Sequence, residues 1–142
     1  RLLEETGFPA SRLTLEVTEQ ALLGDIELAR CLLEELAGQG ARIALDDFGA
    51  GFCNFRYLKL LPLHYLKLDR SMVDGIATDG RDLAVPRAIV AMARALDLEV
   101  IAEGVANEAP RDLLAAEHCA FYQGFLKAQP MPRVEFAALF AQ

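Results

Sequence analysis

The sequence has few cysteines, no excess of positive charge and no long apolar run, and each absence narrows the possible functions. Its three cysteines are Cys31, Cys53 and Cys119. Their number is odd and they lack the paired spacing of a zinc site, so neither a disulfide framework nor a zinc centre is expected. We expect all three to be buried or half-buried thiols of a protein in a reducing cytoplasm.

The net charge is −7, so attraction to nucleic-acid polymers or to anionic lipid is not expected. No apolar run is long enough to cross a membrane, and the N-terminus has no signal-peptide pattern. We therefore expect a cytoplasmic segment without membrane contact, although its parent could be anchored upstream. Residues 1–7 resemble the last turn of a helix that ends at Gly7, and no methionine precedes them, so the sequence is expected to begin inside a larger protein.

The chain of 142 residues is long enough for one domain with a core, and its apolar pattern alternates between strands and helices. Strands are expected at residues 13–19, 42–47, 65–69, 98–103 and 120–125, the last being the weakest. Helices are expected at 25–38, 54–61, 86–96, 110–117 and 134–140. This alternation predicts an α/β fold with parallel strands and right-handed crossovers. Periodicity alone leaves open whether the sheet is doubly wound or part of a barrel.

Polar residues in every predicted strand favour the barrel, because they occupy the face that an open sheet would make apolar. This face holds Glu16, Asp46, Lys67, Asp69, Glu103 and Gln123. The apolar residues of each strand would then contact the helices. The polar residues would converge inside the barrel near the C-terminal ends of the strands, where barrel active sites are built.

Two adjacent carboxylates, Asp46 and Asp47, follow a buried strand and precede a turn at Gly49 and Gly51. They repel each other, and burying either without a partner is costly. A divalent cation that prefers oxygen ligands would hold both. An exposed turn, in which the glycines supply positive φ, is the alternative. In the same way, Lys67 and Asp69 could form a simple internal salt bridge, and Glu103 could be an exposed strand end.

Five motifs, in order and with matching gaps, resemble the EAL-domain family of bacterial cyclic di-GMP phosphodiesterases. They lie at residues 16–19, 46–51, 61–71, 102–105 and 123–125. The resemblance extends over essentially all of residues 1–142 and implies a modified TIM (β/α) barrel. Since a complete barrel has roughly 250 residues, this chain would supply about its C-terminal three-fifths, as five βα units without the N-terminal strands. The Glu-Ala-Leu tripeptide and an asparagine of the family would lie upstream of Arg1.

The resemblance also implies roles for individual residues in a site for two metal ions, Mg²⁺ or Mn²⁺. Metal ligands would be Glu16, Asp46, Asp47 and Glu103, with Asp69 as a further acid beside the metals. Lys67 would lie near the metal-activated water and the scissile phosphate. Gln123 would support the water or the substrate, and Glu19 would steady the loop after Asp47.

The residues themselves suggest two contacts with substrate. Arg70 could bind phosphate, or it could pair with Asp69 or Asp74 instead. Phe125 could stack on a guanine, although packing is the simpler reading. His64 is expected to be a surface or strand-edge histidine rather than a metal ligand, because no second histidine accompanies it in the pattern.

The implied activity is hydrolysis of cyclic di-GMP to linear pGpG in bacterial second-messenger signalling. Two metals would supply a deprotonated water and neutralise the leaving oxygen, and a lysine would add a fixed positive charge. The isolated chain is expected to be weak or inactive, and to associate with itself or with the missing N-terminal part, because a partial barrel exposes unpaired edges.

Three departures from the family pattern are present, and the two alanines among them motivate an alternative function. Ala50 replaces a threonine, Ala106 replaces a glutamate, and residues 53–55 replace a more common Ser-Ser-Leu. The chain would then be a sensor module that binds cyclic di-GMP or a partner protein without turnover.

Overall fold

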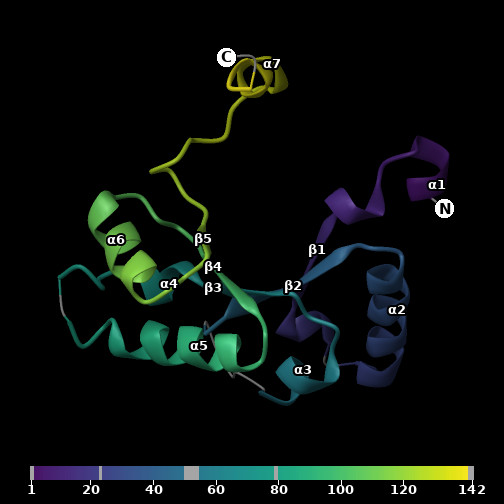
Figure 1. Cartoon of the computed structure of the whole chain (residues 1–142), viewed down its shortest axis with the longest axis horizontal. Helices are drawn as coiled ribbons and strands as arrows, with labels where there is room; N and C mark the ends of the chain where they lie inside the picture. The colour runs from purple at the N-terminus through teal and green to yellow at the C-terminus, as the bar shows by residue number, and fades with distance from the viewer. Residues whose placement is uncertain (1, 23, 50–54, 79, 141–142) are drawn as a thin grey trace.

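The computed structural model describes residues 2–22, 24–49, 55–78 and 80–140, and these form an α/β domain (Figure 1). Its parallel strands pair in the order β1-β2-β3-β4-β5. They are β1 (Thr14–Thr18), β2 (Arg42–Phe48), β3 (Tyr65–Leu68), β4 (Glu99–Ala102) and β5 (Phe121–Tyr122). All five predicted strands are confirmed, and β5 is the shortest. The strand order follows the sequence, as in a barrel, whereas a doubly wound sheet reverses its order at a switch point.

Helices connect the strands close to the predicted positions. They are α1 (Leu2–Thr6), α2 (Ile26–Gly38), α3 (Phe55–Leu60), α4 (Arg70–Val73), α5 (Ala84–Ala95), α6 (Glu108–Ala116) and α7 (Arg133–Ala138), with 3₁₀ turns η1 (Ala10–Arg12) and η2 (Glu19–Leu22). Asp25 caps α2, because its side chain accepts a hydrogen bond from the Leu28 amide at 3.0 Å. Pro86 lies in the first turn of α5, where its missing N–H costs nothing.

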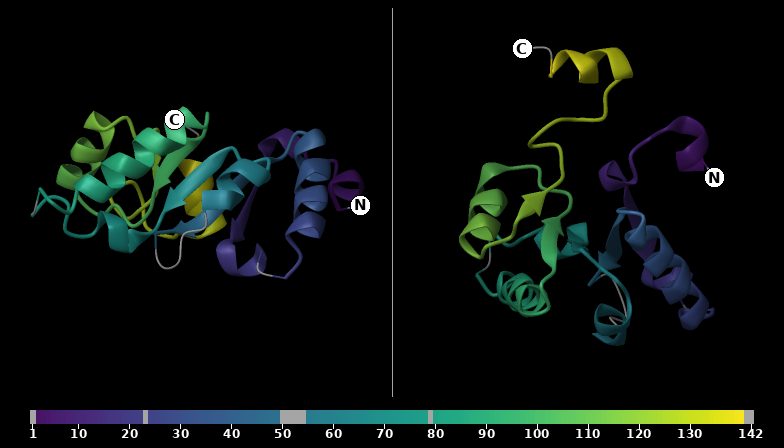
Figure 2. Two further views of the ribbon diagram at one scale, coloured as in Figure 1. Left: turned by 90° about the horizontal axis from the view of Figure 1, so that it is seen from below. Right: turned by 45° about the vertical axis from the view of Figure 1, so that its right-hand side comes forward.

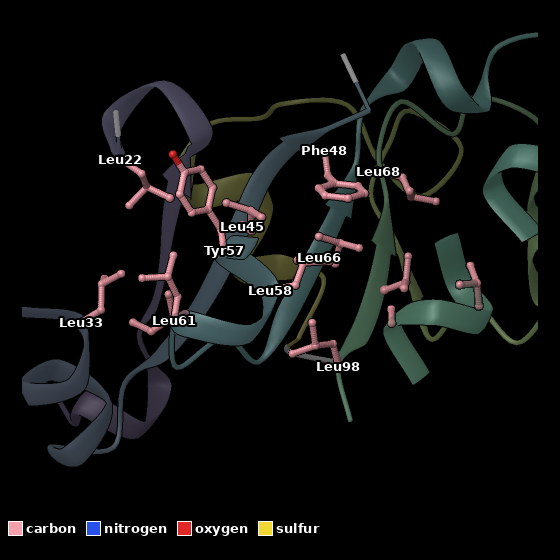
Figure 3. Packing of buried hydrophobic residues seen from close by; sticks show 14 residues of the cluster. Leu22, Leu33, Leu45, Phe48, Tyr57, Leu58, Leu61, Leu66, Leu68 and Leu98 are labelled. Atoms are coloured by element: carbon pink, nitrogen blue, oxygen red, sulfur yellow. The ribbon is translucent and has the colours of Figure 1, made fainter. Parts of the chain in front are cut away.

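The core lies between the sheet and the helices α2, α3 and α5, as the alternation of apolar residues predicts. Ile43, Leu45, Leu66 and Leu68 are 0% exposed. Figure 3 shows Tyr57 and Leu58 of α3 beside the strand residues Leu45 and Leu66. Burial of each such aliphatic side chain contributes about 1.5–3 kcal/mol, so this packing holds the strands, and thereby their C-terminal ends, in place.

The opposite face of the sheet has no comparable helical cover in the described part of the chain. Figures 1 and 2 show α7 standing clear of the sheet, on the side away from α3 and α5. Large apolar side chains of this region are exposed, among them Phe121 at 47%, Val134 at 81% and Phe140 at 74%. In a closed barrel this face would be the interior, which side chains from all the strands fill.

The cysteines follow the expectation only in part. Cys119 is half-buried, burial raises the pKa of its thiol, and its Sγ donates to the Val100 and Phe121 carbonyls. Cys31 is exposed, so the prediction of a buried thiol is wrong for this residue. It lies about two hundred degrees around α2 from the buried Leu33, on the outer face of an amphipathic helix. Cys53 lies outside the described residues.

Within the described parts of the chain, none of the helices has the length and apolar character needed to span a bilayer.

Candidate metal centre

A bulge at the end of β2 determines where the two adjacent carboxylates lie. Leu45 pairs with Leu66, but Phe48 pairs with Leu68, so three steps along β2 match two along β3. Leu45 and Phe48 consequently both point into the core, at 0% and 1% exposure. Asp47 lies in this bulge, and its backbone accommodates the extra residue by adopting a left-handed φ of 57°. Regular alternation would send Asp46 and Asp47 to opposite faces of the sheet, and the bulge removes that constraint.

The carboxylates of Asp46 and Asp47 lie close to a third carboxylate, that of Glu103. Glu103 directly follows β4, and one oxygen of each of the three carboxylates lies within 4.8 Å of the other two. Asp46 and Glu103 are half-buried, and Asp47 is exposed. This spacing allows a single cation to bind all three, and it confirms that the Asp46-Asp47 pair and Glu103 share one region.

Lys67 lies at the centre of this region, on β3, and its side chain is only 4% exposed. Its Nζ is 2.7 Å from Glu16 Oε2, 3.0 Å from Asp46 Oδ1 and 2.7 Å from Glu103 Oε1. Four predicted polar positions, from β1, β2, β3 and the end of β4, therefore converge as the barrel interpretation requires. Lys67 therefore pairs with Glu16, Asp46 and Glu103, and not with Asp69 as the simple salt-bridge alternative supposed.

The charges of the cluster are unbalanced. Burial alone would lower the pKa of Lys67. Hydrogen bonds from its ammonium to Glu103 and Glu16, together with its ion pair with Asp46, outweigh burial and raise the pKa above its ordinary value. Lys67 therefore remains a cation at neutral pH. It faces three carboxylates, with that of Asp47 nearby, so negative charge exceeds positive charge in the site.

These residues fit a divalent cation. Asp46 Oδ1 is buried and accepts no hydrogen bond of good geometry, although Lys67 Nζ lies 3.0 Å away. The contact is thus an ion pair that leaves acceptor capacity on this oxygen. A buried oxygen of this kind is costly unless a partner satisfies it. Carboxylate oxygens from separate strands are the ligands that Mg²⁺ and Mn²⁺ favour, and Asp46, Asp47 and Glu103 would hold the ion.

Asp69 has a structural contact that the sequence analysis missed. Its Oδ1 accepts a hydrogen bond from the Ser71 amide at 2.9 Å, which caps α4. Hydrogen bonds from Ser71 lower the pKa of Asp69. An aspartate just before a short helix is a usual N-cap, so the signal was present in the sequence. A role for Asp69 beside the metals stays a prediction.

The residues predicted to contact substrate differ in their surroundings. Arg70 is exposed, and its Nε donates to Asp74 at 3.2 Å, which confirms one of the alternatives considered for it. Gln123 follows β5 and lines an open pocket of about 500 Å³ together with Tyr65 and Ile101. Phe125 is 63% exposed, so its side chain is not packed in the core of this chain, contrary to the simpler expectation. The substrate roles of these residues stay predictions.

Glu19 begins η2, the turn that follows β1 and contacts β2. The loop it was predicted to steady falls at 50–54, outside the described residues, together with the departures at Ala50, Cys53 and Asn54. Two departures lie among the described residues: Ala106 is exposed, and Phe55, at the start of α3, is exposed as well. The role of Glu19 therefore also stays a prediction.

His64 has a structural role at the edge of β2. Its Nδ1 accepts a hydrogen bond from the Ile43 amide at 3.1 Å. Burial, together with the nearby positive charge of Arg42, lowers the pKa of His64. The contact with the Ile43 backbone agrees with the prediction of a strand-edge histidine.

Comparison with known proteins agrees with this geometry. Residues 1–130 match the EAL domain. The chain is 43% identical to the cyclic di-GMP phosphodiesterase NbdA of Pseudomonas aeruginosa, over 92% of this chain and 17% of that protein. It is 42% identical to the bifunctional diguanylate cyclase/cyclic di-GMP phosphodiesterase MucR of the same organism, over 90% of this chain and 19% of that protein. The chain thus spans less than a fifth of these relatives.

Solved structures give the same result for the fold. The EAL domain of Mycobacterium smegmatis DcpA aligns with a TM-score of 0.92 and 38% identity, over 99% of this chain and 63% of that one. The PaMucR phosphodiesterase in a c-di-GMP complex aligns with a TM-score of 0.86 and 40% identity, over 94% and 54%. Klebsiella pneumoniae BlrP1 in a manganese/cy-diGMP complex aligns with a TM-score of 0.78 and 29% identity, over 87% and 32%. By sequence motifs, strand topology and these likenesses, the chain belongs to the EAL-domain family.

Proposed function

We propose that the chain carries much of the active site of a metal-dependent phosphodiesterase that hydrolyses cyclic di-GMP to linear pGpG. The convergence of Asp46, Asp47 and Glu103 beside the buried Lys67 is the observation that carries this proposal. Relatives that are named cyclic di-GMP phosphodiesterases support the choice of this substrate. A dianionic dinucleotide can approach a cluster with this excess of carboxylates only if cations neutralise it.

Each residue of the cluster has a part in this chemistry. Asp46, Asp47 and Glu103 would hold Mg²⁺ or Mn²⁺, with Glu16 as a further ligand. The bound cations would supply an activated water and neutralise charge on the phosphate oxygens. Lys67, anchored by its strand and by its carboxylate partners, presents a fixed positive charge that attracts the phosphate without reorganisation during the reaction.

We propose further that this chain works as part of a larger barrel. It covers 54% and 63% of two solved EAL chains that it matches, and the side of its sheet without helical cover exposes apolar residues. Upstream strands would close the barrel and complete the set of metal ligands. The isolated chain is then expected to hydrolyse cyclic di-GMP weakly or not at all.

The test compares hydrolysis by this chain and by its parent protein with the upstream strands, each with Mg²⁺ or Mn²⁺. The parent should form pGpG, and Glu103→Ala should abolish product because it removes a ligand and a partner of Lys67. Glu99→Ala is the matched control, since Glu99 is exposed at the other end of the same strand. A folded, metal-loaded parent that forms no more product than Glu103→Ala would refute the proposal.

The alternative is a sensor that binds cyclic di-GMP or a partner protein without turnover. The exposed Ala106, where the family usually has a glutamate, favours this second function. Calorimetry on the same parent protein separates the two. Tight binding of cyclic di-GMP with no linear product over hours would identify a sensor.

A further inference from the structure

The chain that follows β4 runs beside the chain that follows β5, beyond the point where regular strand pairing ends. The Gln123 amide donates to the Ala102 carbonyl at 2.8 Å, and the Val105 amide donates to the Gln123 carbonyl at 3.1 Å. The Leu126 amide then donates to the Val105 carbonyl at 3.1 Å. We call this hydrogen-bonded pair of segments, 102–105 and 123–126, the β4–β5 latch.

Gly124 lies where the latch is tightest. A Cβ at this position would collide with the backbone of Val105, lying 2.5 Å from its nitrogen and 2.7 Å from its carbonyl carbon, with its oxygen closer still. Real Cβ atoms do not approach backbone so closely. The φ of Gly124 lies outside the left-handed region, so the requirement for glycine here is one of space and not of conformation.

Val105 cannot move aside to admit a side chain. It is 0% exposed and belongs to a buried cluster with Val73 and Leu114, against which Leu126 packs. Core packing of this density resists displacement. A side chain at position 124 would therefore push segment 123–126 away from segment 102–105.

We propose that the β4–β5 latch is a positioning device that sets Gln123 against Glu103, with Gly124 as the residue on which it depends. The backbone of Gln123 is hydrogen-bonded to Ala102, directly before Glu103, and to Val105, two residues after it. Separation of the two segments thus moves Gln123 away from the metal-binding carboxylates. This inference rests on the proposed function, in which Gln123 supports the water or the substrate.

The test is a double-mutant cycle in the parent protein. A misplacement of about 1 Å can reduce catalysis on the order of a hundredfold, so Gly124→Ala should lower kcat by about that factor. If Gly124 acts through Gln123, Gly124→Ala should have little further effect in the Gln123→Ala background. Equal losses in both backgrounds would overturn the proposal. Gly38→Ala is the matched control, because a Cβ there meets nothing within 4 Å.

Amide hydrogen exchange provides a second measurement that needs no turnover. The amides of Val105 and Leu126 should be protected in the unsubstituted protein and lose protection in Gly124→Ala, while Ile43 in β2 keeps its protection. Unchanged protection of Val105 and Leu126 in Gly124→Ala would overturn the latch. Because this readout is independent of hydrolysis, failure of the latch is distinguished from failure of the proposed function.

Discussion

Replacement of Lys67 by methionine tests how the charged cluster contributes to stability. The substitution retains an unbranched apolar side chain and removes the ammonium that three carboxylates share at 2.7–3.0 Å. Glu16, Asp46 and Glu103 would then repel one another across the space that the ammonium had occupied. We expect Lys67→Met to destabilise the fold and to increase its dependence on a divalent cation.

The magnitude follows from burial. Removal of one partner from a buried ion pair costs about 3–5 kcal/mol. The side chains of Glu16, Asp46 and Glu103 are 47%, 20% and 22% exposed, so water can take over part of their solvation. We therefore expect a loss of about 2–3 kcal/mol in the free energy of unfolding. This loss corresponds to a fall of about 1 M in the urea midpoint for a domain of this size.

A bound cation should reverse the loss. At a hundredfold excess over its dissociation constant, a ligand of the native state stabilises by about 2.7 kcal/mol, which is similar to the expected cost. Mn²⁺ should also stabilise Lys67→Met more than the unsubstituted chain, because the ammonium no longer competes for the same oxygens.

The assay is urea unfolding of both chains with EDTA and with Mn²⁺, followed by circular dichroism. Lys59→Met is the control, since Lys59 is exposed in the last turn of α3. An unchanged midpoint for Lys67→Met in EDTA would refute the reasoning that the ammonium offsets carboxylate repulsion. Equal stabilisation of both chains by Mn²⁺ would refute the competition between lysine and metal.

Two further predictions concern pH and association. The pKa of His64 is lowered in the fold from an ordinary value of 6.5, so its contribution to stability is present above pH 6.5 and is lost as the pH falls through the lowered pKa. His64→Asn, which keeps an acceptor near Ile43, should therefore reduce the difference in urea midpoint between pH 7.5 and 5.5. The isolated chain should sediment as oligomers at micromolar concentration, because Val134 and Phe140 are 81% and 74% exposed. The double substitution Val134→Glu and Phe140→Glu should shift the chain toward monomer, whereas a monodisperse monomer of the unsubstituted chain would contradict this expectation.

Sequence periodicity predicts the sheet and four members of the charged cluster because both depend on alternation. Leu45 and Leu66 face the helices for the same reason that Asp46 and Lys67 face away from them. The position of each strand in the sheet follows from chain order, so the convergence of Glu16 and Glu103 on Lys67 was also predictable.

Other features could not be read from alternation. The bulge at Asp47 interrupts the period of two, and the sequence around it gives no periodic signal for the extra residue. The cap formed by Asp69 depends on a local hydrogen bond that competes with a site role for the same carboxylate. The length of β5 depends on a neighbouring segment, since its pairing passes into the contacts between Gln123 and Val105.

The left-handed backbone of Asp47 limits which residues can replace this carboxylate during evolution. With φ at 57°, the position accepts asparagine or glycine with little strain, whereas a β-branched or bulky residue is disfavoured there. Asparagine and glycine are each a single base change from aspartate. Under the proposed function, a lineage that loses hydrolysis but still needs a folded domain is therefore expected to acquire one of these two residues at position 47. Asparagine or glycine at this position in a related sequence would indicate a domain that is selected for its fold and no longer for the proposed hydrolysis.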